Sequence, residues 1–172
     1  PRSRGLGDVY KRQTDYLGFW DADLSTPLWE IERLISFMKF NSQIEVVLGA
    51  RVQLLGRNII RKTYRHYIGR LFATFFSIIL KIQVYDTQCG SKIFRFTDKL
   101  YQIFTEPFLT RWLFDVEILA RLIKNSGLQT RPDVFVREEP LLEWRHVGDS
   151  KIGVGNAFQV MAETWKLWKN YR

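Results

Sequence analysis

Two aspartates one residue apart are the first residues of this chain that could do chemistry. Asp21 and Asp23 follow the short aromatic run of residues 16–20 and precede a segment with helical periodicity. Ligands of open α/β sheets bind in the crevice at the carboxyl ends of the strands, where such a turn would lie. Two carboxylates there can share Mg²⁺ or Mn²⁺ with phosphate oxygens. The alternative is that both aspartates only stabilise the start of the next helix through its dipole.

A run of cations without acids extends from residue 51 to residue 81. Arg57, Arg61 and Arg65 recur every four residues on one helical face, and the largely apolar residues 71–80 follow them. This pattern is typical of a segment that lies at a membrane surface, or that holds an anionic head group with an apolar tail. A nucleic-acid surface leaves the apolar run unexplained, so we expect no nucleic-acid partner. The alternative is a solvated basic face on a core helix.

Three later clusters also combine polar residues with the ends of expected elements. DTQCGSK, residues 86–92, is a polar turn before a strand, and WLFDVE, residues 112–117, places Asp115 and Glu117 among large apolar side chains. Buried carboxylates are unfavourable unless paired, so they bind a partner or have a function. The structural alternative is that Asp115 caps a helix and Glu117 binds an arginine. Residues 145–151 surround a glycine with cations, as a phosphate clamp would.

Strands that alternate with helices are expected to position these clusters. Strands are predicted at residues 16–20, 44–48 and 93–96, with an edge strand around residues 134–136. Helices are predicted from Pro27, capped by Thr26, to Met38, and at residues 58–80, 113–124 and 156–171. This alternation predicts one layered α/β domain.

Composition limits the class of protein further. The 172 residues are 46% apolar with a net charge of +8, which excludes a disordered tail and indicates an anionic partner. The single cysteine, Cys89, excludes an internal disulfide and suits a reducing compartment. Residues 8–13 (DVYKRQ) back-translate to an adapter sequence of shotgun libraries. We therefore interpret residues 1–13 as foreign rather than as a natural basic tail, and expect native sequence from about Thr14.

Taken together, the motifs resemble those of family 2 GT-A glycosyltransferases that load a sugar onto a polyprenyl phosphate. The resemblance is strongest to the dolichyl-phosphate β-glucosyltransferase and dolichyl-phosphate mannosyltransferase branch. It extends over nearly everything after Thr14 and rests on the following residues in this order: DAD at 21–23 with LSTP, GAR at 49–51 with Arg65 and Arg70, DTQCGSK with Asp86, Thr87, Gln88 and Gly90, WLFDVE, and Gly148 with Ser150 and Lys151. It implies an α/β GT-A sandwich of the nucleotide-diphospho-sugar transferase type, N-terminally truncated. Residues 14–172 would then be a partial domain that lacks its N-terminal nucleotide-binding strand.

The resemblance also implies an activity. A hexose, glucose in preference to mannose, would pass with inversion from UDP-glucose or GDP-mannose to a polyprenyl (dolichyl or undecaprenyl) phosphate. The protein would work peripherally at the cytoplasmic face of the membrane. Asp23, assisted by Asp21, would hold Mg²⁺ or Mn²⁺ on the donor diphosphate, and Asp115 and Glu117 would complete the catalytic set at the sugar end. The candidates for binding the acceptor phosphate are Arg51, Arg65, Arg70, Arg145 and Lys151.

Ser25 stands where mannosyl-type sites often have Gln, which favours the glucosyl-like branch. A second hypothesis needs no catalysis: the basic and amphipathic segment would dock anionic lipid or another acidic partner. Because the nucleotide-binding strand is expected to be missing, we expect residues 14–172 alone to be a poor catalyst.

Overall fold

The computed structural model describes residues 14–60, 70, 73–78, 80, 82–127, 131–147 and 154–171. The suspected adapter segment, Arg65, Gly148, Ser150 and Lys151 lie outside these residues. In the part of the chain that is described, no helix has the length and apolar content needed to cross a bilayer.

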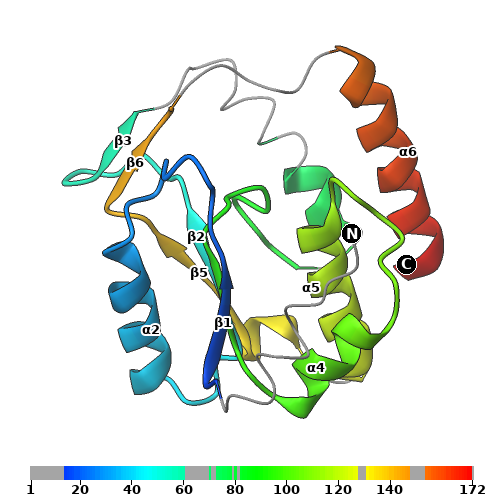
Figure 1. The fold of residues 1–172 in the computed structure, drawn as a ribbon, viewed down its shortest axis with the longest axis horizontal. Coiled ribbons are helices and arrows are strands. Elements are labelled where there is room, and N and C mark those ends of the chain that lie inside the picture. The colour runs from blue at the N-terminus through cyan, green and yellow to red at the C-terminus, as the bar shows by residue number, and fades with distance from the viewer. Residues whose placement is uncertain are drawn as a thin grey trace.

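A four-stranded mixed sheet forms the centre of the molecule (Figure 1). Its order is β1 (Tyr16–Phe19), β4 (Lys92–Arg95), β2 (Val46–Ala50) and β5 (Val136–Pro140). β4 runs antiparallel to β1 and β2, whereas β2 and β5 are parallel. β1, β2 and β5 therefore all point the same way. The α/β expectation is confirmed, and this sheet is compatible with a GT-A-like fold.

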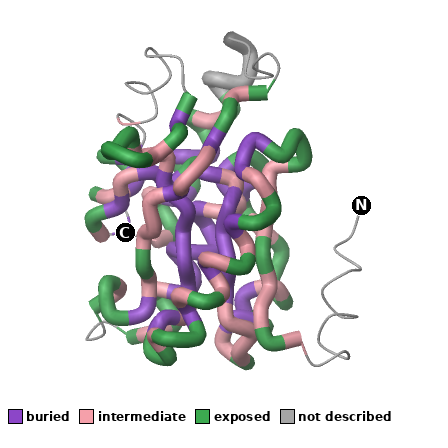
Figure 2. Tube along the Cα trace, turned by 90° about the vertical axis from the view of Figure 1, so that its left-hand side faces the viewer, coloured by how far each residue is buried: buried purple, intermediate pink, exposed green. Residues whose placement is uncertain are grey.

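Helices cover both faces of the sheet because the central strands bury side chains in alternation. On one face, Leu34 and Met38 of α2 (Glu30–Phe40) pack against Val47 and Ile93. On the other face, strand residues such as Leu48 pack against a larger core that includes α4 (Asp98–Thr105), α5 (Phe114–Asn125) and α6 (Val154–Tyr171). Figure 2 shows the buried residues concentrated between these layers.

A second, two-stranded parallel sheet lies beside the ends of the large one (Figure 1). It pairs β3 (Asn58–Ile60) with β6 (Glu143–Arg145). The prediction of helix from residue 58 is wrong at its start, because Ile59 packs instead with Cys89, Leu141 and Trp144. Residues 70, 73–78 and 80 of that predicted helix are helical.

The other predicted elements are confirmed, with some shifted ends and some additions. β2 begins and ends two residues later than predicted, and α2 begins at Glu30 rather than Pro27. Thr26 does not cap α2: its backbone oxygen accepts a hydrogen bond from Trp20 Nε1 (2.7 Å), while its buried Oγ1 has no partner. Val134 lies in a short 3₁₀ helix, η1 (Pro132–Val134), so the edge strand β5 begins at Val136. Sequence analysis missed α4, which Thr97 caps by accepting from Leu100 N–H.

Candidate active site at one edge of the sheet

Three of the predicted motifs meet at one edge of the large sheet, the one formed by the carboxyl ends of β1, β2 and β5. Asp21 follows β1, Arg51 follows β2, and residues 141–147 follow β5. The segment 86–91 arrives at the same edge because β4, which it precedes, runs in the opposite direction. The sheet topology thus gathers three of the five motifs that carry the resemblance, DAD, GAR and DTQCGSK, at the edge where α/β folds bind ligands. WLFDVE joins them through Asp115.

The carboxylate of Asp21 rests directly on Gly90. A Cβ built on Gly90 would lie 2.0 Å from Asp21 Oδ1 and 2.3 Å from Oδ2, so only glycine allows this approach. Burial raises the pKa of Asp21, and the nearby Asp23 carboxylate raises it further, while Arg51 and Lys92 oppose the increase. The protein groups around Asp21 therefore do not fully compensate the charge of its ionised form, and a bound cation would stabilise that form.

Asp23 is exposed at the outer side of the same turn. Its Oδ1 accepts a hydrogen bond from Ser25 N–H (2.9 Å), and Leu24 between them adopts a positive φ of 54°. Among the described residues no group of three or more His, Cys, Asp or Glu side chains forms a metal cage. Two neighbouring carboxylates nevertheless suit Mg²⁺ or Mn²⁺, which take few protein ligands and complete their coordination with water and phosphate oxygens. The donor set and the charge deficit at Asp21 both fit such an ion.

Arg51 is clamped by Asp86. Arg51 Nε and Nη2 donate to the two carboxylate oxygens (2.6 and 2.7 Å), and the Arg51 backbone N–H donates to Oδ2 (3.1 Å). This paired geometry, with the charge of Asp86, raises the pKa of Arg51 despite its burial. The guanidinium also lies 5.3 Å from the ring centroid of Trp144 in β6. Arg51 therefore presents a fixed positive charge beside Asp21.

The predicted residues of DTQCGSK differ in their surroundings. Thr87 is fully buried with an unpartnered Oγ1, whereas Gln88 is exposed. Lys92, only 1% exposed, binds the Cys89 carbonyl oxygen and forms an ion pair with Asp115 Oδ2 (2.8 Å). Asp115 Oδ1 accepts from Val116 N–H (2.8 Å). The ion pair joins the start of α5 to the loop that carries Gly90.

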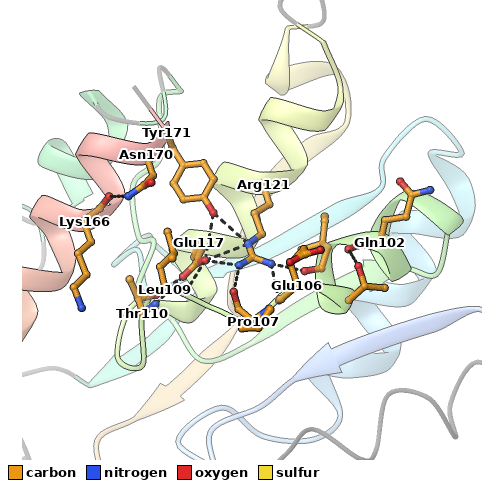
Figure 3. A network of polar contacts seen from close by, with 12 residues as sticks. Gln102, Glu106, Pro107, Leu109, Thr110, Glu117, Arg121, Lys166, Asn170 and Tyr171 are labelled. Carbon is orange, nitrogen blue, oxygen red and sulfur yellow. Dashed lines mark hydrogen bonds and ion pairs between the residues drawn. The ribbon is translucent and has the colours of Figure 1, made fainter.

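Glu117 has a different environment from Asp115. It is completely buried, and its carboxylate accepts hydrogen bonds from Thr110 N–H and Oγ1, from Arg121 and from Tyr171 (Figure 3). A further hydrogen bond comes from Leu109 N–H. The structural alternative, in which Glu117 binds an arginine, describes this geometry. We correct the expectation that Glu117 touches the sugar, because its oxygens are enclosed and already bonded.

Arg145 and Arg70, the other described acceptor candidates, contact different segments at this edge. The Arg145 backbone N–H donates to Ser25 O (2.9 Å), which joins β6 to the Asp21–Asp23 turn, and its exposed side chain pairs with Glu143 (2.9 Å). Arg70 Nη1 donates to Tyr85 O (2.9 Å), and its guanidinium stacks 3.9 Å from the Tyr85 ring centroid. Arg51 and Arg70 thus contact adjacent residues of one segment.

Sequence analysis missed two acids, one buried and one partly buried, that hold this edge together. Glu30, fully buried, accepts from Leu142 N–H and Glu143 N–H and pairs with Arg33. Glu138 of β5 accepts from the backbone of residues 85 and 86. Each acid bonds residues more than 50 positions away, so local sequence patterns carry no signal for them.

No family model matches the chain. Among curated proteins it is 29% identical over 144 residues to a dolichyl-phosphate beta-glucosyltransferase of Trichomonas vaginalis, which covers 81% of this chain and 40% of the relative. The chain is similar to dolichyl-phosphate beta-glucosyltransferases. The Saccharomyces cerevisiae enzyme of that name is 28% identical over 172 residues (89% of this chain, 48% of the relative), and the human one is 29% identical over 130 residues (69% and 39%). These similarities confirm the resemblance drawn from the motifs. The chain spans less than half the length of these relatives.

Proposed function

We propose that this protein is a GT-A glycosyltransferase of family 2 that transfers glucose from a nucleotide sugar, UDP-glucose in preference to GDP-mannose, to dolichyl or another polyprenyl phosphate. The similarity to dolichyl-phosphate beta-glucosyltransferases over most of the chain supports the reaction class. The observation that carries the site assignment is the contact of Asp21 with Gly90 beside the clamped Arg51. This proximity of a carboxylate and a fixed guanidinium at one sheet edge supports the assignment of a cation and a phosphate to this edge.

The chemistry asks little of a general base. A phosphate monoester has a second pKa of about 6, so the acceptor is already largely ionised near neutral pH and can attack the anomeric carbon itself. In-line attack inverts that carbon. The larger requirement is to stabilise charge on the departing nucleoside diphosphate. Mg²⁺ or Mn²⁺ would supply Lewis-acid stabilisation of that charge when bound, and Asp23 with Asp21 are the residues that would hold it.

Other residues of the chain are proposed to bind the acceptor phosphate and to contact the sugar. Arg51, held by Asp86 through Nε and Nη2, offers the rest of its guanidinium to the acceptor phosphate, and Arg70 supplies a second charge. Arg65, Arg145 and Lys151 remain further candidates for that phosphate. Asp115, paired with the buried Lys92, is the acid proposed to face the sugar. The reaction is proposed for the cytoplasmic face of a membrane, where the protein binds peripherally.

The test uses the protein as its gene encodes it. Labelled UDP-glucose and GDP-mannose are each incubated with a polyprenyl phosphate, with and without Mn²⁺, and lipid-extractable label is counted. Asp23→Ala is expected to lower transfer by about 100-fold or more, because it removes a proposed ligand of the cation that stabilises charge in the transition state. Asp15→Ala, an exposed acid just before β1, is the matched control and should retain activity.

Transfer that persists in Asp23→Ala would contradict the site assignment. No transfer from either donor by a folded protein that still binds lipid vesicles would instead support the docking-module hypothesis.

A further inference from the structure

Glu138 holds two successive peptide N–H groups of a distant segment. Its Oε2 accepts from Tyr85 N–H (2.7 Å) and its Oε1 accepts from Asp86 N–H (2.6 Å). Because both carboxylate oxygens are used on adjacent amides, the direction of the segment at residues 85–86 is fixed relative to β5. Glu138 stands opposite Leu48 in the parallel pairing of β2 with β5. The position of the segment is therefore fixed relative to β2 as well.

The segment held by Glu138 carries the contacts of two arginines. The Asp86 carboxylate accepts three hydrogen bonds from the guanidinium and the backbone N–H of Arg51. On Tyr85, the carbonyl oxygen and the ring are both occupied by Arg70. The two guanidinium groups therefore take their positions from neighbouring residues that one carboxylate orients.

Glu138 places a carboxyl group where burial disfavours its ionised form. Burial raises its pKa, while the two backbone N–H groups and the charge of Arg70 act in the opposite direction. A residue that only filled space here would not need a carboxylate, since an apolar side chain avoids the desolvation penalty. What the carboxylate adds is the orientation of two amides at once.

We propose that Glu138 is a positioning residue of the acceptor-phosphate site, which sets the placement of Arg51 and Arg70 relative to each other. This inference rests on the proposed function, because it takes the bound group to be the phosphate of a polyprenyl phosphate. Glu138 itself does not contact that phosphate. Its loss should weaken binding of the lipid phosphate and leave the nucleotide sugar largely unaffected.

The chain offers a matched control for this position. Glu139 is the next residue of β5 and points to the opposite face of the sheet, where it lies 3.7 Å from Arg33 of α2. Glu138→Gln and Glu139→Gln are therefore the same isosteric change on the two faces of one strand. Glu138 also lines a cavity of about 420 Å³ together with Leu48, Val84 and Val136, so the amide has room without overpacking.

The experiment measures binding and turnover in the protein as its gene encodes it. A short-chain polyprenyl phosphate is titrated calorimetrically without donor, and KM and kcat are then measured for lipid phosphate and UDP-glucose. In Glu138→Gln, one peptide N–H loses its acceptor and meets an amide donor. We expect Kd and KM for the lipid phosphate to rise about tenfold, with kcat and the donor KM within about twofold. Glu139→Gln should match the unmodified protein.

Other results have defined meanings. An unchanged Kd for the lipid phosphate in Glu138→Gln, or an equal rise in donor KM, would overturn the inference. If Glu138→Gln does not fold, Asp86→Asn releases Arg51 at the next link and should show the same split. An unmodified protein that binds lipid phosphate without transferring sugar refutes the proposed function, and the binding arm still decides this inference. One that binds no lipid phosphate overturns both.

Discussion

The contact between Asp21 and Gly90 shows how a single missing side chain shapes the candidate site. The Asp21 carboxylate occupies the space where any other residue at position 90 would place its Cβ. The loop before β4 and the turn after β1 therefore approach each other closely, with only the Asp21 side chain between their backbones. Steric fit here also determines electrostatics, because the approach places the Asp21 carboxylate near Arg51 and Lys92.

Gly90→Ala should therefore impair activity and stability together. The new methyl group must displace the Asp21 carboxylate, and overpacking of this kind lowers the free energy of unfolding by about 1–3 kcal/mol. Chemical denaturation and the transfer assay measure the two effects. Gly127→Ala is the control: Gly127 has a φ of +85° with nothing near its Cβ position, at the carboxyl end of α5. Its strain should lower stability and leave transfer per folded molecule unchanged. Equal transfer by both variants would contradict the role of the contact.

At this scale, sequence alone predicts the residues that stand at strand ends. Asp21, Arg51 and Gly90 could be proposed because each follows or precedes a recognisable strand, and ends of such strands share an edge. Glu117 was open to two readings, since a buried acid is either paired or functional, and only its partners decide between them. Glu138 could not be found, because its role depends on the pairing register of β2 with β5.

At the scale of elements, α5 and α6 are joined by polar contacts at both ends of their interface. Near the start of α5, Glu163 of α6 accepts from Trp112 N–H (2.8 Å) and Leu113 N–H (3.2 Å), so α6 supplies the cap that α5 lacks. One turn into α5 and beyond, Glu117 and Arg121 bind Tyr171 (Figure 3). The long terminal helix thus stabilises the helix that presents Asp115 to Lys92.

Arg121→Lys tests this network. The Arg121 guanidinium donates to Glu117, to Tyr171 and to the carbonyl oxygens of Ile103, Glu106 and Pro107. Lysine keeps the charge but not the planar fork, so several buried acceptors lose their donors, at an expected loss of about 2 kcal/mol or more in unfolding free energy.

The control for this change is Arg131→Lys, in which an exposed arginine paired with Asp133 is replaced. That pair is solvated, so the urea midpoint should stay the same as in the unmodified protein. If the two variants unfold at the same urea concentration, the buried network does not contribute as described.

Elements whose formation depends on local sequence could be predicted, and elements that depend on distant pairing could not. α5 and α6 were predicted nearly to the residue because helical periodicity and the stop at Gly127 are contained in the segments themselves. β3 was missed because three residues form a strand only by pairing with β6, 85 positions later, between Asn58 and Glu143. The start of α2 was placed too early because Thr26 and Pro27 look like a helix start. In the structure, however, the Thr26 side chain does not cap the helix, and its backbone oxygen accepts a hydrogen bond from the Trp20 indole.

For the molecule as a whole, two features suggest a surface for anionic lipid. One is the net charge, which stays at +5 (22 Lys and Arg against 17 Asp and Glu) without the suspected foreign residues 1–13, and the other is a set of exposed apolar residues. Ile78 and Phe75 of the helical residues 73–78, and Met161 and Trp165 of α6, are 43–70% exposed. Apolar side chains beside lysines and arginines are the pattern of helices that lie in a membrane interface.

We accordingly expect salt-dependent binding to vesicles that contain anionic lipid. Each cation near such a surface contributes about 1 kcal/mol, so Arg61→Ala with Arg65→Ala should weaken binding by roughly 30-fold at low salt. Co-sedimentation with vesicles at two salt concentrations measures this, with neutral vesicles as the control. Binding that is equal on neutral and anionic vesicles would refute an electrostatic contribution, and binding unchanged in the double variant would remove these two arginines from it.

The parallel pairing of β2 with β5 has a consequence for the synthesis of this protein. Val46 pairs with Val136, 90 positions later in the chain. At about 5–20 residues per second, a ribosome needs roughly 5–20 s to make the intervening residues. During that interval the wholly apolar β2, Val46–Ala50, has a free edge that neighbouring nascent chains can pair with. Protection of that edge until β5 is made should therefore raise the fraction of the protein that reaches its native fold in a cell.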